Sequence, residues 1–113
     1  MNMSIKGTNL DLTPAVKKYV DEKIGALEKY IKGDAVETKV ELERDRKHRS
    51  GEVFRAEVMI VAGGKLMRAE ADGMDIYAAI DLVIPKIKEQ VSKFKDKRST
   101  LERRGARSAK RKI

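Results

Sequence analysis

The stretch FRAEVMIVAGGKLMRAEA, residues 54–71, decides the fold of this chain. Its apolar side chains recur at every second position, at Phe54, Ala56, Val58 and Ile60 and again at Met67, Ala69 and Ala71. A period of two is typical of strands that bury one face. Gly63 and Gly64 separate the two halves and favour a tight turn between antiparallel strands. The stretch therefore predicts a β-hairpin with one apolar and one charged face.

The same period predicts two more strands upstream. One covers residues 36–42, where Val36, Thr38, Val40 and Leu42 alternate with charged residues. The short connection over residues 44–51 favours an antiparallel pairing with the strand that begins at Phe54. The other covers residues 2–7, where Met3 and Ile5 share one side.

Two segments have the helical period instead. Thr13 and Pro14 are typical of a helix start, and Gly33 of a helix end. The apolar stripe of this first helix consists of Val16, Val20, Ile24, Leu27 and Ile31. Asp75 is the expected cap of a second helix, whose stripe consists of Ile76, Ile80, Val83, Ile87, Val91 and Phe94. Pro85 falls on its solvent side, where we expect a kink and no break.

The element order β-α-β-β-β-α predicts the architecture. Each element is apolar on one face only, so both helices should cover one face of a four-stranded sheet in an α+β two-layer sandwich. The first crossover should be right-handed. Beyond Lys97 the apolar period is lost, and we expect a basic disordered C-terminal tail over residues 98–113 after a domain at residues 1–97.

Charge is unevenly distributed along the 113 residues, whose net charge is +8. Residues 1–85 carry 14 basic and 15 acidic side chains, and residues 86–113 carry 12 basic and 3 acidic ones. A near-neutral body followed by a basic segment indicates a polyanionic partner, in particular nucleic acid. The first twelve residues have no secretory pattern and no apolar run is long enough to span a bilayer, so we expect a cytoplasmic protein without a membrane partner.

Catalysis is poorly supported by the composition. The chain has no Cys and one His, which leaves few routes to an activated nucleophile or a general base. His48 lies in the most polar loop, where we expect it to be solvated or to face a phosphate. Gly63, Gly64 and Lys65 do not continue into a phosphate-binding loop, because Leu66 stands where Ser or Thr is required. We therefore expect no enzyme, no cofactor, no metal and no small-molecule substrate.

The last predicted helix gives the strongest binding signal. On a helical projection one row beside its apolar stripe consists of Lys86, Gln90, Lys93 and Lys97. Lys88 and Lys95 form a second row on the opposite flank, where their stems could simply cover the sheet. The exposed sheet face lacks aromatic residues, which argues against base stacking there. A helix flank, a basic tail and the hairpin residues Arg46, Lys47 and Arg49 instead indicate recognition of a structured RNA backbone.

Two helix motifs resemble a known family. They are Thr13, Pro14, Ala15, Tyr19, Val20, Lys23, Leu27, Glu28, Lys29 and Tyr30, and the run from Asp75 to Asp81 followed by Lys86, Gln90, Lys93 and Lys95. Together they resemble the ribosome hibernation-promoting factors, also called ribosome-associated translation inhibitors, over about residues 1–97. The chain resembles a short form that lacks the further C-terminal domain. It departs from the family pattern at Glu89, where many members have Arg, and at Pro85.

The resemblance implies a protein that binds the small ribosomal subunit near the decoding centre. There it would occlude mRNA and the A-site and P-site tRNAs, keeping idle ribosomes inactive in starvation or stationary phase. It implies rRNA contacts for Lys29, Lys86 and Lys93, while Lys97 and the hairpin residues Arg46, Lys47 and Arg49 are added from the charge pattern. We expect a monomer off the ribosome.

Two alternatives stay open. A meander followed by a basic helix is also typical of a general double-stranded RNA-binding module, which would prefer free duplex RNA to small subunits. A hydrolase of a phosphorylated substrate is more distant, and its turnover would depend on His48.

Overall fold

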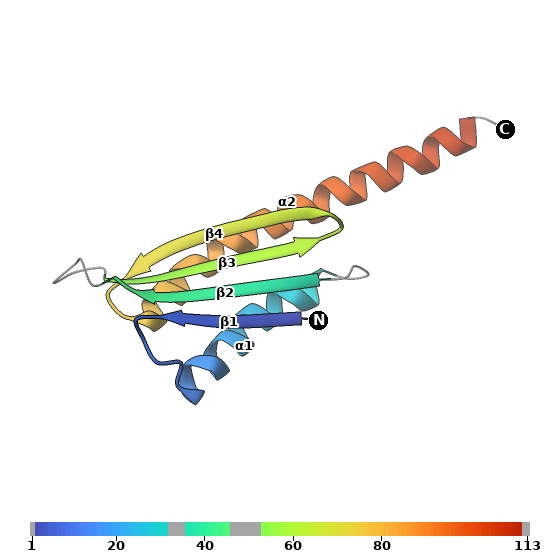
Figure 1. The fold of residues 1–113 in the computed structure, drawn as a ribbon. Coiled ribbons are helices and arrows are strands. Elements are labelled where there is room, and N and C mark those ends of the chain that lie inside the picture. Colours follow the sequence, from blue (N-terminus) through green and yellow to red (C-terminus); the bar gives the residue numbers. More distant parts are fainter. Residues whose placement is uncertain (1, 32–35, 46–52, 112–113) are drawn as a thin grey trace.

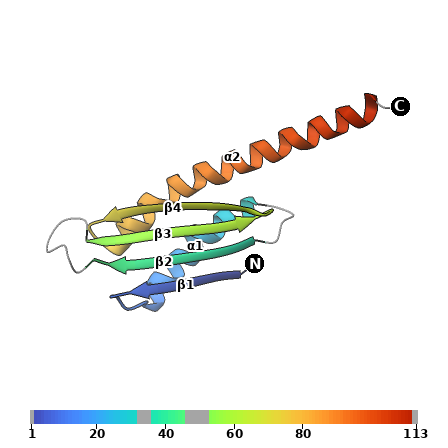
Figure 2. The same ribbon diagram turned by 45° about the horizontal axis from the view of Figure 1, so that its top comes forward.

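The computed structural model describes residues 2–31, 36–45 and 53–111, with residues 96–111 described by their backbone alone. Six elements follow in the predicted order: β1 (Asn2–Thr8), α1 (Pro14–Tyr30), β2 (Val36–Arg44), β3 (Phe54–Ala62), β4 (Lys65–Gly73) and α2 (Ile76–Arg111). The strands form one sheet in the order β1-β2-β3-β4. β1 is parallel to β2, and the remaining pairs are antiparallel. Figures 1 and 2 show both helices on one face of this sheet, which confirms the two-layer α+β prediction.

The helix starts form as the sequence predicts. The Val16 N–H donates to Thr13 Oγ1 at 3.2 Å, and the Ala78 N–H donates to Asp75 Oδ1 at 2.8 Å. These side chains satisfy main-chain donors that have no partner inside a helix. The predicted end of α1 at Gly33 lies outside the described residues. So do His48 and the basic residues Arg46, Lys47 and Arg49 between β2 and β3.

The core lies between the sheet and the helices. Both predicted helical stripes are buried, except that Ile76 and Phe94 at the two ends of the α2 stripe are only partly buried. The strands contribute alternate residues, among them Val40, Val58 and Ala69, which stand opposite one another in register. This alternation leaves the other sheet face to solvent.

One turn and one close contact depend on glycine. Gly63 and Gly64 have φ angles of 56° and 75°, the left-handed conformation that a two-residue hairpin requires. Gly73 serves a different purpose, because a Cβ there would lie 2.5 Å from the Ala79 main-chain nitrogen. The end of β4 therefore passes directly against the first turn of α2.

The C-terminal part of α2 is described by its backbone alone. The helix runs through the exposed Pro85 without a break and is described to Arg111, while the disorder predicted for residues 98–113 stays a prediction. The lost apolar period shows only that this part has no core to face. Leu, Glu, Ala, Lys and Arg are good helix formers, and no proline interrupts them after Pro85. Figure 1 shows the helix extending beyond the sheet.

Candidate nucleic-acid interface

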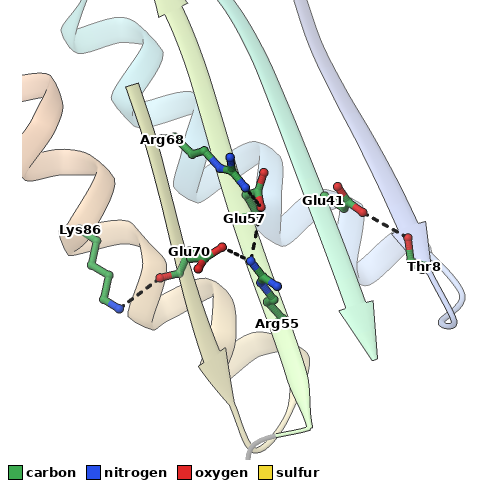
Figure 3. Close-up of polar contacts among 7 residues, drawn as sticks. All are labelled: Thr8, Glu41, Arg55, Glu57, Arg68, Glu70 and Lys86. Atoms are coloured by element: carbon green, nitrogen blue, oxygen red, sulfur yellow. Dashed lines mark hydrogen bonds and ion pairs between the residues drawn. The ribbon is translucent and has the colours of Figure 1, made fainter. Parts of the chain in front are cut away.

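The open face of the sheet is charged but internally balanced. On β3 and β4 the Arg55 guanidinium pairs with Glu70, and Arg68 pairs with Glu57 at 3.0 Å (Figure 3). The Arg55 guanidinium also lies 3.7 Å from the Glu57 carboxylate. On the neighbouring strands Thr8 donates to Glu41 at 3.4 Å. Because basic and acidic side chains alternate, this face offers little net field to a polyanion.

The free edge of β4 is covered by α2. The Lys86 ammonium donates to the Glu70 carbonyl oxygen at 3.1 Å (Figure 3), and the Gln90 side chain hydrogen-bonds to both main-chain polar groups of Arg68. Farther along, Lys93 pairs with Glu89 at 3.1 Å on the exposed surface. Lys86 and Gln90 of the first predicted row thus cover a sheet edge, a role that was expected mainly for the second row.

The second row faces α1 across a line that we call the seam. The seam consists of Tyr19, Lys23 and Tyr30 from α1 and Tyr77, Asp81, Lys88 and Lys95 from α2. Contacts between the two helices occur at both of its ends.

A cluster of four side chains closes one end of the seam. Tyr19 and Tyr77 meet edge to face, with ring centroids 5.1 Å apart, and the Lys23 ammonium lies 5.5 Å from the Tyr19 ring. The Tyr19 hydroxyl donates to the Asp81 carboxylate. This hydrogen bond, with burial and the negative charges of Asp81 and Asp75, raises the pKa of Tyr19 above its ordinary value of about 10.

The other end of the seam is open and basic. The Lys95 ammonium lies 3.9 Å from the centroid of the Tyr30 ring. Lys88 is exposed on the same face of α2, seven residues before Lys95. Among the described side chains, no carboxylate pairs with Lys23, Lys29, Lys88 or Lys95. Residues 14–30 and 76–95 of the helix layer carry eight basic and five acidic residues, and the four strands carry six of each, so the excess of positive charge lies on the helix layer.

The predicted site residues are spread over this layer. Lys29 lies in the last turn of α1, beside a groove between α1 and β1 that is lined by Met3, Gly25 and other residues. Lys86 and Lys93 lie on the opposite flank of the layer. Lys97 belongs to α2, with only its backbone described. Arg46, Lys47 and Arg49 lie outside the described residues.

The sequence analysis did not identify the seam as a site. Its signal was present, because Tyr19, Lys23, Ala26 and Tyr30 recur at spacings of three and four beside the apolar stripe of α1.

Within the described part of the chain, no group of His, Cys, Asp or Glu could hold a metal ion, and no helix is long and apolar enough to cross a membrane.

Comparison with known proteins identifies the family of the chain. The family described as Sigma 54 modulation protein / S30EA ribosomal protein matches residues 3–99. The chain belongs to this family. The S30EA match includes both helix motifs and all four strands.

Relatives within the S30EA family have named roles. A ribosome hibernation promotion factor of Bacillus subtilis is 36% identical over 97 residues, and one of Picosynechococcus is 33% identical over 97 residues. Each alignment covers 86% of this chain and 50% of the relative, so the chain spans about half the length of the curated relatives it matches.

Solved structures share the S30EA fold. The N-terminal domain of Thermus thermophilus Protein Y superimposes with a TM-score of 0.70 at 33% identity, covering 83% of this chain and 99% of that one. A ribosomal subunit interface protein from Coxiella burnetii has the same fold, with a TM-score of 0.67 at 20% identity, covering 85% and 99%.

Proposed function

We propose that this chain is a ribosome hibernation factor that binds the small ribosomal subunit near the decoding centre. Bound there, the folded body inhibits translation by occluding the space of mRNA and of the A-site and P-site tRNAs. Support comes from its membership of the S30EA family and from the names of its 33–36% identical relatives. A ribosomal partner implies a cytoplasmic location and a role in starvation or stationary phase.

The observation that carries the proposal is the division of charge between the two layers. The four strands carry six basic and six acidic residues, whereas residues 14–30 and 76–95 of the two helices carry eight basic and five acidic ones. Among the lysines of the helix layer, Lys23, Lys29, Lys88 and Lys95 have no carboxylate partner among the described residues. Phosphates are therefore expected at the helix layer, where lysines fix the position of the protein without reading base sequence.

Lys29, Lys86, Lys93 and Lys97, with Arg46, Lys47 and Arg49, remain the proposed rRNA contacts. The Lys86 ammonium is only partly available to an RNA phosphate, because it also donates a hydrogen bond to the Glu70 carbonyl. The Lys93 ammonium forms an ion pair with the Glu89 carboxylate, which competes with a phosphate for it.

The test is co-sedimentation with small subunits alongside a cell-free translation assay. If about five phosphates are neutralised, log affinity falls with log salt at a slope of about −4. The double variant Lys29→Glu/Lys93→Glu should flatten this slope, release the protein and restore translation.

A matched control reverses two lysines away from the helix layer. Lys39 is exposed on the sheet face and Lys65 is exposed next to the β3–β4 turn, so Lys39→Glu/Lys65→Glu makes the same change in net charge. This control should bind nearly as the unmodified chain does. Equal loss in both double variants would mean that only total charge matters, and displacement by excess duplex RNA would favour a general double-stranded RNA-binding module.

A further inference from the structure

The aromatic rings of the chain are distributed unequally. There are three Tyr, two Phe and no Trp, and all five rings lie among the described side chains. Phe54 and Phe94 pack against the core. Tyr30 and Tyr77 are 43% and 39% exposed, but Tyr77 packs edge to face on Tyr19. In the described structure, Tyr30 is therefore the exposed ring that has no aromatic neighbour.

Tyr30 is held differently from the other tyrosine of α1. The hydroxyl of Tyr19 is tied to Asp81, whereas the hydroxyl of Tyr30 has no hydrogen-bond partner among the described residues. The contact that Tyr30 does make is with the Lys95 ammonium, 3.9 Å from its ring centroid. An aromatic face and a cation thus lie together on the surface, in a contact that does not form part of the core.

The surroundings of this pair favour an anion. Lys88 lies on the same face of α2 as Lys95, seven residues earlier, and neither lysine has a carboxylate partner among the described side chains. The acidic residue of the seam, Asp81, and the neighbouring Asp75 lie beside Tyr19 at its opposite end. A phosphate is therefore more stable at the Tyr30 end than at the Tyr19 end.

We infer that Tyr30 and Lys95 form a binding site for one unpaired nucleotide of rRNA, with the base stacked on the Tyr30 ring and the phosphate beside the Lys95 ammonium. This inference rests on the proposed function and adds a mode of recognition to it. Every base has a π-face, so stacking on an aromatic ring holds a nucleotide whatever its sequence. The flexible stem of Lys95 lets the ammonium move from the ring to the phosphate.

The experiment separates the ring from the charge. Tyr30→Leu removes the aromatic face and should weaken binding to small subunits by about 5- to 100-fold, with the salt slope unchanged. Tyr30→Phe keeps the ring and should bind as the unmodified chain does. Lys95→Gln keeps the ring but loses the cation, and the salt slope should become shallower by about one.

Leu66→Ala is the control, because Leu66 is also an exposed apolar side chain but lies on the sheet side. It should leave the affinity unchanged, and thermal unfolding of each variant checks that it is folded. Ultraviolet irradiation of the complex should crosslink Tyr30 to a nucleotide.

Two results would overturn the inference. One is unchanged affinity of Tyr30→Leu, and the other is an equal loss in Tyr30→Phe, which would assign the contact to the hydroxyl. If the unmodified chain does not bind small subunits at all, the proposed function fails as well, and that outcome is read before any variant is compared.

Discussion

The side-chain amide of Gln90 pairs with both main-chain polar groups of Arg68. Its Oε1 accepts from the Arg68 N–H at 3.0 Å, and its Nε2 donates to the Arg68 carbonyl. One turn earlier in α2, Lys86 donates to the Glu70 carbonyl at 3.1 Å. These groups of β4 are the ones that another strand would use, and an open strand edge promotes association between chains. Helix α2 thus protects the edge of its own sheet.

Replacing Gln90 should uncover this edge. Gln90→Ala removes two solvent-accessible hydrogen bonds, so we expect a loss of about 1 kcal/mol in the free energy of unfolding. The Arg68 groups then become available to a second chain. Urea denaturation measures the first effect, and sedimentation over a range of protein concentrations measures the second.

Glu89→Ala is the matched control for this prediction. Glu89 neighbours Gln90 and, among the described residues, pairs with Lys93 on the exposed surface, so the variant should lose less than about 0.5 kcal/mol and associate no more than the unmodified chain does. If both variants lose the same stability and neither associates, the edge contact of Gln90 is not important in solution.

The sequence predicted the elements well because burial follows periodicity. Every position of the α1 stripe, from Val16 to Ile31, is buried, and the hairpin at Gly63 and Gly64 has the predicted turn. These features depend on residues close together in the chain, whose direction is fixed by the helical or extended backbone.

Contacts between elements were much less predictable. A helical projection gives the direction of Gln90 but not its distance from β4, so phosphate contact was favoured for its row over covering of the sheet edge. The contact of Tyr19 with Asp81 joins residues 62 positions apart and depends on how the two helices lie across the sheet. Likewise, the lost period after Lys97 indicated the end of the core, and it did not indicate the end of the helix.

Removing the Tyr19 hydroxyl should loosen the closed end of the seam. Tyr19→Phe keeps the ring contact with Tyr77 but cannot donate to Asp81, so the variant should be less stable at neutral pH. The pKa of Tyr19 is raised in the folded chain, so its contribution is complete below the ordinary pKa of about 10 and is lost as pH rises through the higher folded value. Urea denaturation across this alkaline range should show the difference between the two chains shrinking.

Tyr30→Phe is the control for the alkaline experiment. The Tyr30 hydroxyl has no hydrogen-bond partner among the described residues, so its removal should not change the stability at neutral pH. A difference between unmodified chain and Tyr19→Phe that stays constant well above pH 10, or that grows there, would contradict the role of the hydrogen bond.

Thr38 offers a way to stabilise the core. It is fully buried on β2, and its Oγ1 has no hydrogen-bond partner in the described structure. Thr38→Val replaces the hydroxyl with a methyl group of similar shape, so the free energy of unfolding should rise by about 1 kcal/mol. Thr38→Ser keeps the hydroxyl, loses a methyl group and should lower stability by about 1 kcal/mol. A destabilised valine variant would mean that the hydroxyl is satisfied after all.

Two glycine-to-alanine variants should change stability in opposite directions. A Cβ at Gly73 would lie 2.5 Å from the Ala79 nitrogen and 2.9 Å from its Cα, so Gly73→Ala must push β4 away from α2 and should cost about 1–3 kcal/mol. A Cβ at Gly25 would meet nothing within 4 Å. Because alanine favours the helix interior, Gly25→Ala should gain about 0.5–1 kcal/mol. Thermal and urea unfolding measure the change in stability of both variants. An unchanged stability of Gly73→Ala would contradict the close approach of strand and helix.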